Sequence, residues 1–162
     1  MKRTALFSIF ILLLTIIFPA CKEDIYIDWK LLNDKALADT VEKYKDNKDF
    51  FSTASGLSYK VIYNSGHPKK PDAATYILVS YTAKLIDGSV FESGTFDNSN
   101  SPEYLPGSIY ISGFQEAVKK MPVGSKFIFY IPSPLGYDTI STNPKIPPYS
   151  TLIFEVNLDS TN

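Results

Sequence analysis

Cysteine, histidine and net charge are all scarce in this 162-residue sequence. The single cysteine, Cys21, excludes a disulfide within the chain. The single histidine, His67, has no other histidine or cysteine near it in the sequence, so we interpret it as a solvated loop residue and not as a metal ligand or a base. The formal net charge is −1, and the only basic pairs past the N-terminus are Lys69-Lys70 and Lys119-Lys120. This balance gives no reason to expect nucleic acid as a partner.

The sequence also lacks an apolar run long enough to cross a membrane. Residues 5–18 are nearly all apolar, but a membrane-spanning helix needs roughly 20 such residues. Lys2 and Arg3 precede this run, and Pro19, Ala20 and Cys21 come directly after it. A basic start, a short apolar run and a small residue are typical of a secretion signal, so we expect residues 1–20 to be a signal peptide.

Cys21, directly after the apolar run, resembles the cysteine of a bacterial lipobox. That resemblance implies lipidation of its sulfur and cleavage before it, with several acyl chains giving firm anchoring to the outer membrane, on its periplasmic or surface face. The alternative is ordinary signal cleavage that leaves a free thiol; we favour lipidation. Lys22, Glu23 and Asp24 are similar to the charged tag of some bacterial surface lipoproteins, and a solvated tether explains them equally well.

The mature chain has the composition of one folded domain, 44% hydrophobic and 14% aromatic over the whole sequence. We divide it into a tether with a helix, residues 21–55, and a β-rich domain, residues 56–162. Residues 28–51 are predicted to be helical and 52–55 a linker. The helix is predicted from apolar residues that recur near a spacing of 3.6, namely Leu31, Leu32, Ala36, Leu37, Val41 and Tyr44. It packs on its own domain, pairs with a second copy of the chain in a homodimer, or spaces the domain from the membrane.

Alternating apolar residues predict strands over residues 57–63, 75–86, 126–131 and 151–158. The segment 126–131 is apolar on both faces, which predicts a central strand. Residues 114–121 are predicted to form a short helix, and residues 93–107 and 132–148 irregular loops, the second rich in proline. This order of elements predicts an α+β fold with an antiparallel sheet curled over a helix.

The strongest candidate for a site is a strand, turn and strand around Asp87 and Gly88. Val79, Tyr81, Ala83 and Leu85 share one strand face, Asp87-Gly88 favours a tight turn, and Phe91 and Glu92 come after it. One face then carries a phenol, a ring and a carboxylate, which predicts a pocket wall. Burial in the core is the competing interpretation for the aromatic residues, although Tyr137, in a loop rich in proline and glycine, has little packing reason to be there.

Short motifs along the chain match one family in their order. They are Gly56-Leu-Ser-Tyr59, Val79-Ser-Tyr81, Leu85-Ile-Asp-Gly88, Val90-Phe-Glu-Ser93, Ile111-Ser-Gly-Phe-Gln-Glu-Ala117, Met121-Pro-Val-Gly124, Ile131-Pro-Ser-Pro-Leu-Gly-Tyr137, Ile146-Pro-Pro148 and Leu152-Ile-Phe-Glu-Val156. Each piece alone is weak, but the ordered set resembles the FKBP-type peptidyl-prolyl isomerases from Gly56 to near the C-terminus. A leading helix before Ser55-Gly-Leu-Ser-Tyr59 is similar to the exported members.

This resemblance implies a half-open antiparallel sheet wrapped on one short helix, with an aromatic pocket between them that isomerises X–Pro bonds of exported proteins. It implies proline-containing polypeptides as substrates and no metal or cofactor. The pocket residues carried over by motif are Tyr81, Phe91 and Phe154 as walls, Glu92 beside Tyr81, Phe114 as floor, Tyr110 and Ile111 on the helix side, and Tyr137 and Ile146 from the proline-rich loop.

The chemistry fits these residue types, because the X–Pro bond is held planar by amide resonance with a barrier near 20 kcal/mol. A dry aromatic pocket favours the less dipolar twisted bond, and the Tyr137 phenol is placed to bond a substrate carbonyl.

The sequence departs from the usual family pattern in three places: Glu92 stands for Asp, Phe114 for Trp, and Gly136-Tyr137-Asp138 for Ala-Tyr-Gly. Neither Tyr104 nor Leu105 is assigned to a further pocket aromatic. Two rivals remain: a binding module without catalysis, and a surface lipoprotein that captures a nutrient, which rests only on residues 22–24.

Overall fold

The protein is described by a computed structural model that covers residues 24–73, 75–97, 111–141 and 143–161. The predicted signal peptide, Cys21, Lys22 and Glu23 lie outside these ranges, as do Tyr104, Leu105 and Tyr110. Within them, no helix is long and apolar enough to cross a membrane.

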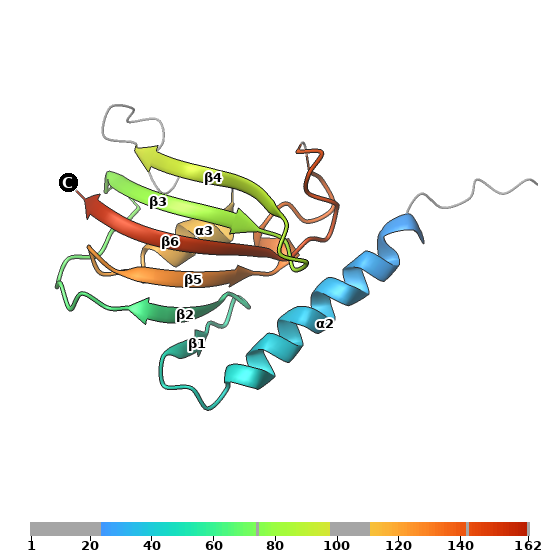
Figure 1. Ribbon diagram of the computed structural model, residues 1–162, viewed down its shortest axis with the longest axis horizontal. Coiled ribbons are helices and arrows are strands. Elements are labelled where there is room, and N and C mark those ends of the chain that lie inside the picture. Colours follow the sequence, from blue (N-terminus) through green and yellow to red (C-terminus); the bar gives the residue numbers. More distant parts are fainter. Residues whose placement is uncertain (1–23, 74, 98–110, 142, 162) are drawn as a thin grey trace, which may run out of the picture.

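Six antiparallel strands form one open sheet in the order β1-β2-β5-β6-β3-β4 (Figure 1). Their bounds are β1 Phe50–Ser52, β2 Ser58–Tyr63, β3 Ile77–Lys84, β4 Val90–Asp97, β5 Lys126–Ile131 and β6 Leu152–Thr161. The predicted α+β fold is thereby confirmed, as is the inner position of residues 126–131. Asp87 and Gly88 form the predicted turn, in which Gly88 has a φ of 85°, a left-handed conformation that glycine adopts without strain.

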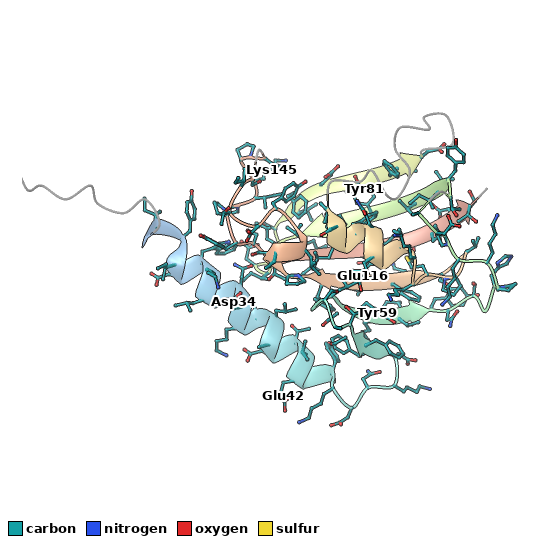
Figure 2. All side chains as sticks on the ribbon, turned by 180° about the vertical axis from the view of Figure 1, so that it is seen from behind. Asp34, Glu42, Tyr59, Tyr81, Glu116 and Lys145 are labelled. Carbon is teal, nitrogen blue, oxygen red and sulfur yellow. The ribbon has the colours of Figure 1, made fainter. Side chains whose placement is uncertain are left out.

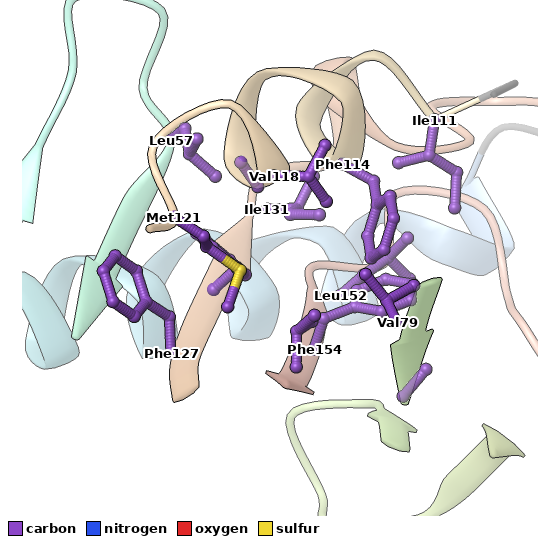
Figure 3. Close-up of a cluster of buried hydrophobic side chains, with 14 of the residues drawn as sticks. Leu57, Val79, Ile111, Phe114, Val118, Met121, Phe127, Ile131, Leu152 and Phe154 are labelled. Carbon is purple, nitrogen blue, oxygen red and sulfur yellow. The ribbon is translucent and has the colours of Figure 1, made fainter. Parts of the chain in front are cut away.

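The core lies between this sheet and the short helix α3, Ser112–Val118, on one of its faces. Figure 3 shows Phe114 and Val118 directed from α3 onto the strands, where they meet Ile131, Leu152 and Phe154. Cross-strand pairs such as Phe129 with Phe154 put their side chains on this same face, so the alternating pattern of the sequence is satisfied.

Gly113 allows α3 to approach the sheet closely. A Cβ built on this residue would lie 2.4 Å from Cγ2 of Ile131 and 3.1 Å from the backbone oxygen of Leu135. Real side chains do not tolerate the first of these distances, so a hydrogen at this position is what sets the helix–sheet spacing above the pocket.

The leading helix α2, Ile27–Tyr44, comes after a 3₁₀ turn at Asp24–Tyr26 and packs against the opposite face of the sheet. Its predicted apolar stripe is wrong in phase at the N-terminal end, because Leu31 and Leu32 are 61% and 53% exposed. The side chains that meet the domain are instead Trp29, Asn33, Ala36, Leu37 and Thr40. Several of these are polar or carry a polar atom, which a count of hydrophobic spacing does not detect.

The helix also ends earlier than predicted, at Tyr44 and not near residue 51. The N–H of Asn47 bonds to the carbonyl of Tyr44, and the side chain of Asn47 accepts the N–H of Asp49, so the chain turns here. Phe50 then enters β1, where its ring lies 5.5 Å from Tyr44 and 6.1 Å from Tyr130. Residues 50 and 51, predicted to be the end of the helix, therefore form β1 because they pair with β2. Ser52, predicted to begin a linker, is the last residue of β1.

The strand that follows the Asp87-Gly88 turn is longer than predicted. Residues 93–107 were predicted to be irregular, but β4 continues to Asp97, and its residues 93–97 all pair with β3. The small and polar residues of this segment suggested a loop, while the long neighbouring strand β3 gives its backbone partners along one edge.

Candidate binding pocket

An open cavity of about 170 Å³ lies at the N-terminal end of α3, between that helix and the inner face of β3, β4 and β6. It is lined by Tyr81, Glu92, Phe96, Ile111, Phe114, Tyr137 and Phe154. Figure 2, which views the molecule from the α3 side, shows Tyr81 on the strand beside the helix. Six of the residues named from the sequence thus come together around one cavity, although they come from five separate segments.

Phe154 is the centre of the aromatic wall. Its ring centroid lies 5.1 Å from that of Phe114 and 6.0 Å from those of Tyr81 and Phe91. Phe154 occupies the inner face of β6 opposite Ala83, whose small side chain leaves space for these rings to meet. Tilted and edge-to-face contacts of this kind are the favourable arrangements for aromatic pairs, so the wall is held firmly from behind.

A β-bulge decides how Phe91 and Glu92 are presented. Ala83 pairs with Glu92 while Lys84 pairs with Val90, so Phe91 is one extra residue in β4. A bulge interrupts the strict alternation of a strand, so the consecutive side chains of Phe91 and Glu92 can both lie on the cavity side of β4. Phe91 is buried behind the wall with 6% exposure, and Glu92 reaches the edge of the cavity.

The phenol of Tyr81 is engaged by this carboxylate. Its hydroxyl donates a 2.7 Å hydrogen bond to Oε1 of Glu92. Burial, and then this hydrogen bond, raise the pKa of Tyr81 far above its ordinary value, so the phenol is neutral at any physiological pH. The longer Glu92 therefore still reaches Tyr81, and the bond fixes the ring as a wall of the cavity.

Tyr137 comes from the proline-rich loop after the 3₁₀ turn η4, Ser133–Leu135. The N–H groups of Gly136 and Asp138 both donate to the carbonyl of Ser133, which clamps the backbone on each side of Tyr137. Burial, with a smaller contribution from Glu92, raises the pKa of Tyr137. Its hydroxyl has no hydrogen-bond partner among the described residues, so this donor is available to a ligand in the cavity.

Phe96 is a lining residue that the sequence interpretation missed, because it falls in the segment predicted to be irregular. Once β4 is extended, Glu92, Gly94 and Phe96 recur with a period of two and share a face, which is the signal that would have found it. Ile146 and Phe91, both predicted to belong to the pocket, are buried in the core and are not among the lining residues. Within the described residues, no group of three histidines, cysteines or acids is placed to hold a metal ion.

The family model of FKBP-type peptidyl-prolyl cis-trans isomerases matches residues 67–159. The chain is 44% identical over 107 residues to the FKBP-type 22 kDa peptidyl-prolyl cis-trans isomerase of Escherichia coli strain K12, which covers 66% of this chain and 50% of that protein. It is 39% identical over 106 residues to the outer membrane protein MIP of Legionella longbeachae, covering 65% of this chain and 44% of that protein.

Among solved structures, the crystal structure of FkpA from Escherichia coli is similar with a TM-score of 0.70 and 25% sequence identity, covering 86% of this chain and 64% of that chain. The chain spans about half the length of the curated relatives it matches.

Proposed function

We propose, because this chain belongs to the FKBP-type peptidyl-prolyl cis-trans isomerase family, that its pocket catalyses cis–trans isomerisation of X–Pro bonds in polypeptides. The observation that carries this is the open cavity walled by Phe154, Phe114 and Tyr81. Its volume of about 170 Å³ suffices for a proline ring, since a cavity of about 150 Å³ in another protein takes up benzene.

Isomerisation of an X–Pro bond requires only that the pocket exclude water from the bond and that one hydrogen bond orient the substrate. The planar X–Pro amide is the more dipolar state, so an apolar wall destabilises it relative to the twisted transition state. Tyr81 does not offset this effect, because its hydroxyl is already bonded to Glu92. Tyr137 has the free donor, and its phenol bonds a carbonyl of the substrate and fixes the direction in which the chain lies.

A protease-coupled assay on a prolyl tetrapeptide tests this function with the wild type and Tyr137→Phe. We expect acceleration over the uncatalysed rate, and a loss of roughly fivefold to thirtyfold in kcat/KM when a hydrogen bond worth about 1–2 kcal/mol is removed. Tyr63→Phe is the matched control, because Tyr63 is exposed on β2 and does not line the cavity. Isomerisation at the uncatalysed rate in the wild type would refute the enzymatic function.

A second candidate is a binding module without turnover, and the observation that favours it is Phe114 at the floor, where the family usually has a tryptophan. Phenylalanine gives less area and no indole donor. Calorimetry with a macrolide immunosuppressant separates the two functions: binding with no acceleration of isomerisation selects the binding module.

Export and anchoring are also part of the proposal, with residues 1–20 as signal peptide, residues 21–55 as tether and helix, and Cys21 as the lipidated residue. The relative named outer membrane protein MIP supports a location at the outer membrane. We propose attachment there through the acyl chains of Cys21. The mass of the mature N-terminus tests this, and an unmodified Cys21 would contradict it.

We also propose that two copies of the chain form a homodimer through α2. It is supported by the apolar residues that α2 turns to solvent, Ile27, Leu31 and Leu32. Sedimentation of the mature chain against a Leu31→Glu variant tests it: the wild type sediments as a dimer and the variant as a monomer. A monomeric wild type would contradict this component and leave the enzymatic function untouched.

A further inference from the structure

Helix α2 is bonded to the far end of the loop that carries Tyr137. The indole N–H of Trp29 donates to Oγ of Ser150 at 3.0 Å, and that hydroxyl donates in turn to the carbonyl of Pro147 at 2.6 Å. The backbone N–H of Thr151 donates to Oδ1 of Asn33 at 2.7 Å, across 118 positions of sequence. These contacts hold the last residues of the loop before it enters β6.

Both the oxygen and the nitrogen of the Asn33 side-chain amide are hydrogen-bonded where α2 meets the loop. Its side chain is 0% exposed, the only fully buried polar side chain of α2, and its Nδ2 donates to the carbonyl of Trp29 at 2.8 Å. A buried amide needs partners for both its oxygen and its nitrogen, and the observed placement of the loop brings the Thr151 N–H to Oδ1. An apolar side chain at this position would pack against the domain without fixing that placement.

The held end of the loop is connected to Tyr137 within the loop itself. The N–H of Tyr149 donates to the carbonyl of Asp138 at 2.7 Å, and Asp138 is the residue directly after Tyr137. Tyr149 and Asp138 have φ values of 64° and 48°, in the left-handed region that side chains other than glycine rarely occupy. Such a backbone persists only where its surroundings impose it, and the bonds from α2 to Ser150 and Thr151 are contacts that impose it here.

We propose that α2 is a positioning element of the pocket, in which Trp29 and Asn33 act through residues 149–151 to hold Tyr137 at the cavity. The leading helix is then more than a spacer between anchor and domain: its docking and the occupation of the cavity stabilise one another. The activity readout rests on the proposed isomerase function, while the binding and fluorescence readouts do not.

Trp29 provides a direct probe, because it is the only tryptophan of the chain. Its indole is bonded to the loop, so its emission reports the docking of α2 against Ser150. We expect titration of the full mature chain with a macrolide immunosuppressant, or with the peptide Ala-Leu-Pro-Phe, to shift the Trp29 emission and to protect α2 amides from hydrogen exchange. The coupling is reciprocal, so Asn33→Ala weakens binding of the same probe roughly tenfold. Saturable binding with no change at Trp29 and no change in Asn33→Ala would overturn the proposal.

A kinetic comparison separates positioning from plain stability. Asn33→Ala is set beside Leu37→Ala, which also loosens α2. Leu37 lines a small cavity together with Tyr130, Thr151 and Ile153, but its side chain has no group that could hydrogen-bond to the loop. Both are assayed at a temperature where circular dichroism shows them folded. Asn33→Ala is expected to raise KM roughly threefold to tenfold with kcat little changed, while Leu37→Ala changes neither. Equal effects of the two α2 variants would overturn the proposal.

The double variant Asn33→Ala with Tyr137→Phe completes the test. If Asn33 acts through Tyr137, the loss of kcat/KM caused by Tyr137→Phe shrinks from roughly fivefold to thirtyfold to roughly twofold to threefold when Asn33 is already alanine. Losses that multiply independently would show that Asn33 does not act through Tyr137. A wild type without isomerase activity refutes the proposed function, and the decision on α2 then comes from the fluorescence and binding readouts.

Discussion

Tyr81 lies directly opposite Gly94 in the pairing of β3 with β4. Directly paired residues of an antiparallel ladder point to the same face, so a side chain at position 94 would stand beside the Tyr81 ring. Glu92 and Phe96, which lie two positions before and after Gly94 and share its face of β4, both line the cavity. A Cβ built on Gly94 meets no atom within 4 Å. The cavity is therefore open partly because β4 has no side chain at this position.

Filling this space should close the pocket without disturbing the fold. We expect Gly94→Leu to lower kcat/KM for a prolyl peptide at least tenfold and to abolish macrolide binding, because the leucine occupies the volume that the proline ring needs. The melting temperature should change little, since nothing is displaced. Thr95→Leu is the control: Thr95 is also exposed on β4 but, paired with Ser80, points to the other face. Full activity in Gly94→Leu would show that substrate binds elsewhere.

The bond between Tyr81 and Glu92 predicts an abnormal alkaline titration. Burial and this bond raise the pKa of Tyr81 above the ordinary value of about 10. Because the folded-state pKa exceeds the unfolded one, the stabilising contribution of the neutral phenol is complete below about pH 10 and is lost as pH rises through the folded-state pKa. The wild type is therefore expected to keep Tyr81 protonated until it unfolds in alkali.

Phenolate absorbance measures this, and subtracting the titration of Tyr81→Phe isolates one phenol among the 11 tyrosines. Glu92→Gln keeps a hydrogen-bond acceptor but removes the charge, so Tyr81 should titrate at lower pH in that variant than in the wild type. A difference signal centred near pH 10 in the folded wild type would contradict the burial and bonding described for Tyr81.

Much of the fold and of the site was predictable because it depends on patterns local to each element. Alternation over β3, β5 and β6 and the turn at Asp87-Gly88 predicted the strands, and the ordered motifs predicted which side chains would meet. Six of the nine residues carried over into the pocket by resemblance line one cavity. Parity along a strand places Tyr81 and Phe154, whereas Ile111, Phe114 and Tyr137 lie outside the strands and were predicted only by the ordered motifs.

The failures share a different physical cause. The end of α2 at Tyr44 and the extension of β4 to Asp97 are both decided by pairing with a second strand, β2 beside β1 and β3 beside β4, which the propensity of each segment taken alone does not include. The docking face of α2 depends on Asn33, a polar residue whose burial is explained only by the Thr151 N–H. Phe96 was missed as a consequence of the β4 error. Tertiary hydrogen bonds therefore overrode local propensity in each case.

The contact between α3 and β5 links stability to pocket shape. Gly113→Ala places a methyl group 2.4 Å from Cγ2 of Ile131, so the helix must rise from the sheet or Ile131 must leave its rotamer. Overpacking of this kind costs about 1–3 kcal/mol, which should appear as a lower urea midpoint with an unchanged slope. Ile131→Leu removes the branch at Cβ, so the double variant should recover part of the loss, limited by the Leu135 oxygen at 3.1 Å.

Because α3 also places Phe114 at the pocket floor, the single variant should lose macrolide affinity and the double variant should regain it in parallel with stability. A stable Gly113→Ala protein with normal affinity would mean that α3 is not held at the spacing described.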